Sequence, residues 1–327
     1  MSFPIRRGGV RGFMGRVLMV GLLAQGLLYG NAYAHEHGLM TDEQMYEALG
    51  WDFAATEVTV EQVGDNLYVL FGIGGNIAVS VGDDGVLIVD DQFPEMIPKV
   101  KAAIAELGGG AVDFVVNSHW HFDHADGNLA LGSQGAWIIS QANSRAMNTE
   151  DHVIDLVGIG KYNQPAYPAH ALADITFDDR MSLHFNGEQI DLLHYGPAHT
   201  SGDAVTLFRG HNAVHFGDVF GGGYPYIDVG NGGSISGMIE FCSAVLAEID
   251  SETKVIPGHG AVSTYADLEA YIAMLSTVRD RVAALIAEGK TLEQVIAAAP
   301  TREFDERYGN PAQLVTLAYA SLQGVSP

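Results

Sequence analysis

Cysteine and basic residues are scarce in this sequence. Cys242 is the single cysteine among 327 residues, so no disulfide can form within the chain. Lysine and arginine together number 16 against 40 aspartate and glutamate residues, which gives a formal net charge of −24. A negative field of this size repels nucleic acids and phosphorylated substrates. We therefore expect a small-molecule substrate, no nucleic-acid partner, and a fold that depends on its apolar core, for which 47% hydrophobic residues are sufficient.

Signatures of phosphate binding and of repeats are missing as well. The glycine run at 221–223 is not followed by the G-K-[ST] of a phosphate-binding loop. No internal repeat is evident, and no heptad pattern continues long enough for a coiled coil. These absences argue against a P-loop nucleotide site, a solenoid and a coiled coil, and they leave the oligomeric state open.

The first 34 residues have the composition of an export signal. An apolar run over residues 17–24 follows four arginines, Arg6, Arg7, Arg11 and Arg16. Ala32-Tyr33-Ala34 then has the small-x-small form of a cleavage site. The apolar run is short for a membrane-spanning helix of about 20 residues, although an uncleaved anchor stays the alternative. We predict a signal peptide over residues 1–34, a mature chain that starts at His35 and contacts no membrane, and a periplasmic or secreted protein.

The most informative residues lie just after an apolar run over residues 112–117. They read His119-Trp120-His121-Phe122-Asp123-His124. In an extended backbone alternate side chains point the same way, so His119 and His121 can meet at one point. Asp123 and His124 can reach a second point nearby. The spacing H-x-H-x-D-H is typical of a metal site, and three unrelated histidines are the weaker interpretation.

Three further candidate ligands follow strand-like segments. His199 lies in a loop after residues 189–194, Asp218 follows the apolar run 214–216, and His259 stands between two glycines after residues 255–256. A loop at the end of a strand can hold a side chain rigidly and still leave one side open, as a catalytic metal site requires. Each of these residues alone would be an ordinary loop residue. In this order behind H-x-H-x-D-H, the set is specific.

With these four motifs, the chain resembles the metallo-β-lactamase superfamily over roughly residues 58–271. That superfamily includes hydroxyacylglutathione hydrolases and lactonases. The resemblance implies an α/β fold, a four-layer αββα sandwich with the metals at one edge of the sheets. It also implies two metal sites: one formed by His119, His121 and His199, and the other by Asp123, His124 and His259, with Asp218 bridging the two.

The kinds of ligand point to catalysis. Imidazole nitrogens and carboxylate oxygens suit zinc, and the lack of thiolates argues against a closed structural zinc site. Two metal ions about 3.5–4 Å apart lower the pKa of a shared water to around 7, which supplies a bridging hydroxide at neutral pH. The resemblance thus implies a hydrolase of amide, lactam, lactone or ester bonds with two Zn²⁺ per chain, or iron or manganese. Asp123 and Asp218 would be its catalytic carboxylates, and Asp123 could orient the hydroxide.

The exact activity stays open at this point. The export signal makes β-lactam hydrolysis the leading named activity. However, the best-known subclass of β-lactamases has a cysteine in the second site, whereas here Asp218 takes the bridging place and Cys242 lies in a helical-looking stretch. Scarce basic residues near the C-terminus speak against a glutathione thioester. A mononuclear iron sulfur dioxygenase using His119, His199 and Asp218 is one alternative, and a non-catalytic binding protein of the same fold is another.

The remaining sequence predicts one domain over residues 58–327. Strands are predicted over residues 57–63, 66–71, 76–81 and 86–90, and again within 175–218. Helices are predicted over residues 94–107, 265–288, 292–299 and 311–322, the last three as an outer layer of the same domain. Residues 35–57 read as a short, polar and helical lead-in with a mobile start.

Two segments are candidates for the walls of a substrate pocket. Residues 152–172 are long and irregular for a plain connection, which fits either a lid or a structural excursion. Tyr224 and Tyr226 come soon after Asp218 and are predicted to border the substrate or to stabilise an oxyanion. Simple packing of this glycine- and aromatic-rich turn is the alternative.

Overall fold

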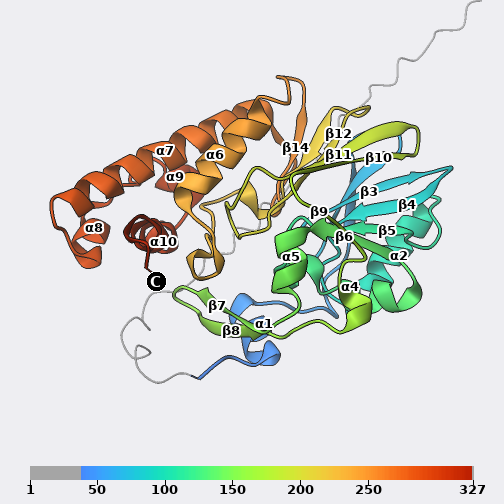
Figure 1. Cartoon of the computed structure of the whole chain (residues 1–327), viewed down its shortest axis with the longest axis horizontal. Helices are drawn as coiled ribbons and strands as arrows, with labels where there is room; N and C mark the ends of the chain where they lie inside the picture. The colour runs from blue at the N-terminus through green and yellow to red at the C-terminus, as the bar shows by residue number, and fades with distance from the viewer. Residues whose placement is uncertain (1–37, 326–327) are drawn as a thin grey trace, which may run out of the picture. The chain divides into compact units, whose positions relative to one another are not determined.

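Two β-sheets face each other between outer layers of helices in the computed structural model of this protein, which describes residues 38–325 (Figure 1). The first sheet has the order β1-β2-β3-β4-β5-β6-β9 and the second the order β10-β11-β12-β13-β14-β15. The αββα sandwich expected from the sequence is therefore confirmed.

The first sheet begins as an antiparallel meander and continues as parallel strands. Its strands are β1 (Thr59–Gln62), β2 (Leu67–Phe71), β3 (Ile77–Gly82), β4 (Gly85–Val89), β5 (Phe114–Val116), β6 (Trp137–Gln141) and β9 (Ile175–Phe177). Because β4, β5 and β6 run parallel, their carboxyl ends meet at one edge of the sheet.

The second sheet is antiparallel from β10 to β13 and then gains the parallel strand β14. Its strands are β10 (Arg180–Phe185), β11 (Glu188–Leu193), β12 (Val205–Phe208), β13 (Ala213–His215), β14 (Lys254–Ile256) and β15 (Ser263–Thr264). Strands β11, β13 and β14 point the same way, so their carboxyl ends also share one edge.

Alternation along the strands produces the layers. In β4, Val86 and Ile88 join the core beneath the first helical layer, whereas Leu87 and Val89 join the core between the two sheets. Alternate side chains of a strand point to opposite faces, so a strand that is apolar at every position is buried on both faces. The β12 side chains likewise divide between the inter-sheet core and the core beneath α6, α7 and α10.

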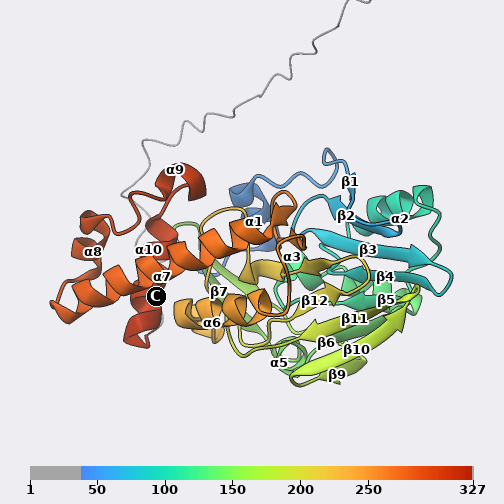
Figure 2. The same ribbon diagram turned by 90° about the horizontal axis from the view of Figure 1, so that it is seen from above.

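The helices cover the outer faces of the two sheets (Figure 2). On the first sheet lies α2 (Ile97–Glu106), and on the second lie α6 (Ile235–Leu246), α7 (Tyr265–Ala287) and α10 (Ala312–Gln323). The shorter helices are α3 (Phe122–Ala125), α4 (Asn128–Leu131), α5 (Ala142–Met147), α8 (Leu292–Ala298) and α9 (Asp305–Tyr308). Single 3₁₀ turns are η1 (Gly132–Gln134), η2 (Ala169–Ala171), η3 (Gly217–Val219) and η4 (Val229–Asn231).

The described part of the lead-in before residue 58 is helical, as the sequence predicts, and it packs against the domain. Residues 42–49 form helix α1 (Asp42–Leu49), which begins with a capping box between Thr41 and Gln44. Met45 is fully buried, and the ring of Tyr46 packs edge-on against Phe53 and Phe93. The sequence prediction weighted the polar face of this segment and missed the apolar face that it buries.

The segment 152–172 is more regular than its sequence suggests. Its first part is the two-stranded hairpin of β7 (His152–Leu156) and β8 (Gly160–Gln164). The hairpin lies beside α1 (Figure 1), and the backbone N–H of Met40, just before this helix, donates a hydrogen bond to the carbonyl of Lys161. The prediction of an irregular loop is therefore wrong for this part.

Among residues 38–325, no helix has both the length and the apolar character needed to cross a membrane. The predicted signal peptide over residues 1–34 lies outside the described residues.

Candidate metal centre

All seven predicted metal ligands meet at the edge of the sandwich where the strands named above end. His119, His121, Asp123 and His124 follow β5, His199 lies in the loop between β11 and β12, Asp218 lies in η3 after β13, and His259 follows β14. Loops at the carboxyl ends of both sheets thus deliver the ligands to one place.

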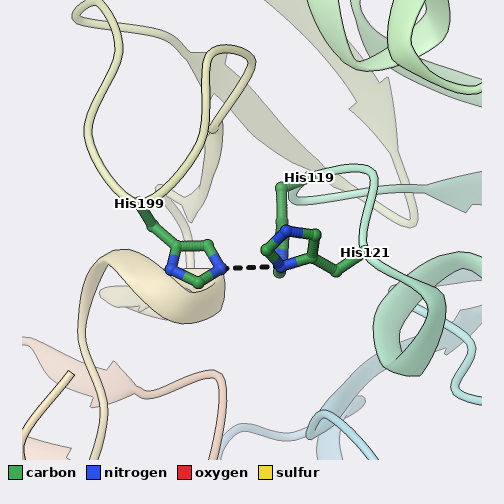
Figure 3. A group of neighbouring side chains, drawn as sticks. All are labelled: His119, His121 and His199. Atoms are coloured by element: carbon green, nitrogen blue, oxygen red, sulfur yellow. Dashed lines mark hydrogen bonds between the residues drawn. The ribbon is translucent and has the colours of Figure 1, made fainter. Parts of the chain in front are cut away.

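Three histidines form the first cluster, here called the tri-histidine group: His119, His121 and His199. One ring nitrogen from each lies within 4.8 Å of the others, and all three residues are buried. Figure 3 shows the three imidazoles turned toward one another, with His119 and His121 on one loop and His199 on another. Nε2 of His199 lies 2.9 Å from Nδ1 of His121, the contact drawn as a dashed line.

Asp123, His124 and His259 form the second cluster, here called the mixed group. Their ligand atoms also lie within 4.8 Å of one another. Nε2 of His259 is 3.1 Å from Nε2 of His124 and 3.2 Å from Oδ2 of Asp123. Nitrogen and carboxylate oxygen together are the donors that zinc and similar ions accept.

Asp218 lies between the two groups. Its Oδ1 is 3.1 Å from Nε2 of His124 and 3.4 Å from Nε2 of His259 in the mixed group. Its Oδ2 is 3.8 Å from Nε2 of His199 in the tri-histidine group. One carboxylate oxygen therefore faces each group, which is the arrangement needed for a bridging ligand.

The outward nitrogens of the tri-histidine group are held by acceptors. His121 donates from Nε2 to Asp228 at 2.9 Å, and His199 donates from Nδ1 to the carbonyl of Tyr226 at 2.9 Å. Nδ1 of His119 lies 3.0 Å from the hydroxyl of Ser118. An imidazole that donates from its outer nitrogen presents a lone pair at the inner one, as a metal ligand must.

Asp90 provides the same support on the other side. It accepts hydrogen bonds from Nδ1 of His124 at 2.7 Å, and from the hydroxyl of Ser118 at 2.7 Å and its backbone N–H at 2.6 Å. Through Ser118, it also connects with His119. Asp90 has a φ of +63°, in the left-handed region that residues with a side chain rarely adopt. Sequence analysis named neither Asp90 nor Asp228 as a site residue. The position of Asp90 at the end of β4 was the one available signal.

This arrangement fits a metal ion. Nε2 of His119 is buried and has no hydrogen-bond partner within residues 38–325. The facing nitrogens of His121 and His199 are both lone-pair atoms, because their other nitrogens donate outward. Two lone pairs at 2.9 Å repel each other unless a cation binds them both. The donor set and this unpaired atom therefore suit a divalent ion.

Burial and charge set different pKa values in the two groups. Burial lowers the pKa of His119 well below its usual range, and the neighbouring histidines lower it further. Burial also lowers the pKa of His199, assisted by His121. Neutral imidazoles bind metals, so the lowered pKa values of His119 and His199 favour the state of these two ligands that metal binding requires.

The mixed group holds protons more firmly. Although burial opposes protonation, Asp218, Asp123 and Asp90 raise the pKa of His124 well above its usual range. Asp218 and Asp123, again against burial, raise the pKa of His259 to about 10. The pKa of Asp218 is in turn held well below its usual range by His259 and His124, although burial acts in the opposite direction.

Glycines make room for the ligands at two positions. A Cβ atom at Gly258 would overlap the carboxylate of Asp218, and one at Gly75 would overlap the ring of His124. The glycine that precedes His259 in the sequence is therefore needed by a neighbouring ligand rather than by His259 itself.

A cavity of about 330 Å³ opens onto the cluster and is bordered by Asp123, Asp218 and His259. Tyr224 and Tyr226 also line it. The hydroxyl of Tyr224 donates 2.8 Å to Oδ1 of Asp305, so its ring borders the cavity while its hydroxyl is engaged elsewhere. This geometry favours the predicted bordering role over the stabilisation of an oxyanion by Tyr224.

Residues 71–237, about half of the chain, match the family described as the metallo-beta-lactamase superfamily. The chain belongs to this superfamily. Members of known structure share its fold. The DIM-1 metallo-beta-lactamase is 19% identical, with a TM-score of 0.54 over 68% of this chain and 98% of that chain.

Two other solved structures resemble the chain to a similar degree. The metallo-beta-lactamase from Pontibacter korlensis is 14% identical, with a TM-score of 0.54 over 67% of this chain and 99% of that chain. The stereoselective inverting sec-alkylsulfatase Pisa1 from Pseudomonas sp. is 14% identical, with a TM-score of 0.62 over 82% of this chain and 51% of that chain. Such low identities establish the fold and leave the activity to the site.

Proposed function

We propose that this superfamily member is a dinuclear metal-dependent hydrolase that cleaves an amide, lactam, lactone or ester bond. The observation that carries the proposal is the carboxylate of Asp218, which turns one oxygen toward each ligand group. A single metal in the tri-histidine group would leave the convergence of Asp123, His124 and His259 without a use.

Two divalent ions bound here, zinc being the best suited, would supply Lewis acidity toward a carbonyl oxygen and lower the pKa of water at the site. The tri-histidine group and the mixed group would hold one ion each, with Asp218 shared between them. Asp123 borders the cavity and can accept the proton of the attacking water at Oδ2. The partners Asp90 and Asp228 keep the ligand rings oriented, which preserves the geometry through the reaction.

The mononuclear iron dioxygenase is less well supported. It would use His119, His199 and Asp218 and would not need the mixed group. A non-catalytic binding protein that holds no metal would not need the buried carboxylates that orient the ligand rings. Both alternatives therefore leave observed features of the site unexplained.

Metal content and hydrolysis test the proposal together. We expect zinc-loaded protein to contain two metal ions per chain by elemental analysis. It should hydrolyse at least one member of a panel containing a β-lactam, a lactone and a nitrophenyl ester, with the activity lost on chelation and restored by zinc. Phosphodiesters should stay intact. One tightly held iron without a second metal, or cleavage of a phosphodiester or an alkyl sulfate while every carbonyl substrate is inert, would overturn the proposal.

β-Lactam hydrolysis belongs in this panel as the named activity that the sequence favours, and the fold similarity to two metallo-beta-lactamases supports its inclusion. Export to the periplasm or the exterior, proposed from Arg6 to Ala34, is compatible with that role. Mass spectrometry of the exported chain should find His35 at its N-terminus, and an intact Met1 would contradict cleavage.

A further inference from the structure

The cavity beside the metal centre has one strongly apolar wall. The metal ligands lie on one side of it. The other side is lined by aliphatic and aromatic side chains: Leu49, Trp51, Phe122, Ile154, Leu156 and Ile159. A pocket with a polar reactive end and an apolar wall binds molecules that have the same two parts.

Two segments build most of this wall, one that precedes the family match and one that lies inside it. Leu49 is the last residue of α1, and Trp51 follows it directly. Ile154 and Leu156 lie in β7, and Ile159 lies at the turn of the hairpin. All of these except Leu49 and Trp51 fall within residues 71–237, yet the hairpin is held in place by the lead-in through the bridge between Met40 and Tyr162.

The wall is packed from behind. The ring of Trp51 contacts Phe93 edge-on with centroids 5.2 Å apart, and Phe122 contacts Tyr162 of β8 at 5.0 Å. Aromatic pairs at these separations fix one another. The apolar surface is therefore a built feature of the cavity.

Charge in the cavity favours a neutral ligand. Of the described residues, those that line the cavity include no lysine or arginine. Lys161 borders a neighbouring hollow, where its Nζ pairs with Asp155 at 2.9 Å. A carboxylate far from the reacting bond would have no cation to receive it, and it would lose its hydration without compensation.

We propose that the substrate is an uncharged ester or lactone whose apolar acyl or alkyl chain lies along this wall, with Trp51 and Ile159 determining the preference. This inference rests on the proposed hydrolase function and narrows it. It places β-lactams, which normally carry a carboxylate, among the poorer carbonyl substrates.

A series of neutral 4-nitrophenyl esters from acetate to octanoate measures the chain preference on the zinc-loaded full-length protein. We expect kcat/KM to rise by about fourfold for each added methylene until the cavity is filled, because each buried methylene contributes apolar transfer energy. A carboxylate at the far end of the chain, as in the 4-nitrophenyl hemiester of a dicarboxylic acid, should remove most of this gain. Equal rates along the series, or faster cleavage of the carboxylate esters, would overturn the inference.

Two substitutions with matched controls locate the effect. Trp51→Ala should flatten the chain-length series, whereas Trp137→Ala, which removes the 55% exposed tryptophan of β6, should leave the series unchanged. Ile159→Lys should improve cleavage of a carboxylate-bearing β-lactam relative to its methyl ester. Ile296→Lys on α8 is the matched control, because Ile296 is 42% exposed and Ile159 is 45% exposed. It should not change the preference between the β-lactam and its methyl ester. If both lysine variants changed the preference between the β-lactam and its methyl ester equally, the wall would not determine that preference.

Binding gives a readout that does not depend on turnover. Calorimetry with the zinc-loaded protein should show tighter binding of 1-octanol than of 1-butanol, and Trp51→Ala should reduce the difference. If no carbonyl substrate is cleaved yet the alcohols bind in this order, the hydrolase function fails while the pocket assignment stands. If carboxylate-bearing substrates are cleaved best and the alcohols bind equally, the pocket assignment fails while the hydrolase function stands.

Discussion

The tri-histidine group and the mixed group differ in how deeply their ligand side chains are buried and in how many of them are held by hydrogen bonds. Every imidazole of the tri-histidine group is buried, and each has an outward partner for its second nitrogen. In the mixed group, the side chain of His259 is 43% exposed, and Asp123 borders the cavity. Preorganised ligands lose little freedom on metal binding, so the tri-histidine group should bind its ion more tightly. The mixed group, which faces the substrate, keeps more freedom.

Substitution of Asp218, the ligand that the two groups share, should reduce the difference in metal affinity between them. Asp218→Asn takes away the negative charge that faces both groups, so both ions should be held more weakly. We expect activity to fall by on the order of 100-fold or more, because loss of even an outer partner costs about 10- to 100-fold. Elemental analysis and assays of the same sample measure both effects.

Asp83→Asn is the matched control, since Asp83 is an exposed residue in the turn between β3 and β4. It should retain two ions and normal activity. If Asp218→Asn did the same, Asp218 would be an ordinary turn residue and the bridge would be refuted.

Removing one ligand from each group should separate the two ions. His121→Ala should abolish activity and release the ion of the tri-histidine group, whereas His259→Ala should deplete the ion of the mixed group and keep the first. Metal content after dialysis against a weak chelator gives the order of loss. His184→Ala on the exposed face of β10 serves as the control. Loss of both ions in equal measure from both variants would mean that the groups form one inseparable site.

The metal ligands could be predicted from the sequence because they occur within local sequence patterns. His119 to His124 lie together in the sequence, and each later ligand lies in the loop or turn that follows an apolar strand. Strands β2 to β4 of the first sheet were predictable for the same reason, since glycine turns separate their apolar runs. The short α9, four residues long, has no such pattern and was not predicted.

The supporting residues could not be predicted because they are distant in sequence from what they support. Asp228 is 107 residues from His121, and Asp90 is 34 residues from His124. Both are single aspartates in a chain with 40 acidic residues, so composition does not distinguish them. The packing of α1 was missed for a similar reason, because Tyr46 and Trp51 find partners such as Phe93 only in the folded protein.

These distant partners permit a finer comparison of the two groups. Asp90→Asn weakens the acceptor for His124 in the mixed group, and Asp228→Asn weakens the acceptor for His121 in the tri-histidine group. Each should reduce the zinc affinity of its own group by about 10- to 100-fold. Because Asp90 also reaches His119 through Ser118, its substitution should affect both groups, whereas Asp228→Asn should affect one. Competition with a zinc chelator measures both affinities. If the two variants lost zinc affinity equally at both groups, Asp90 and Asp228 would not hold separate groups.

The smallest expected effect is a difference in pH dependence. The pKa values of His119 and His199 are lowered, which favours their neutral forms at pH 7 and above, so zinc binding to the tri-histidine group should change little between pH 7 and 8. The pKa of His259, raised to about 10, means that zinc must displace its proton throughout that range. Affinity at the mixed group should therefore rise with pH, by about tenfold per pH unit for each proton displaced, and level off once the pH exceeds that pKa. Zinc titrations at pH 7 and 8 should release protons only when the second ion binds, which would support displacement of protons at the mixed group alone. An equal pH slope for both ions would show that the two halves do not differ in protonation.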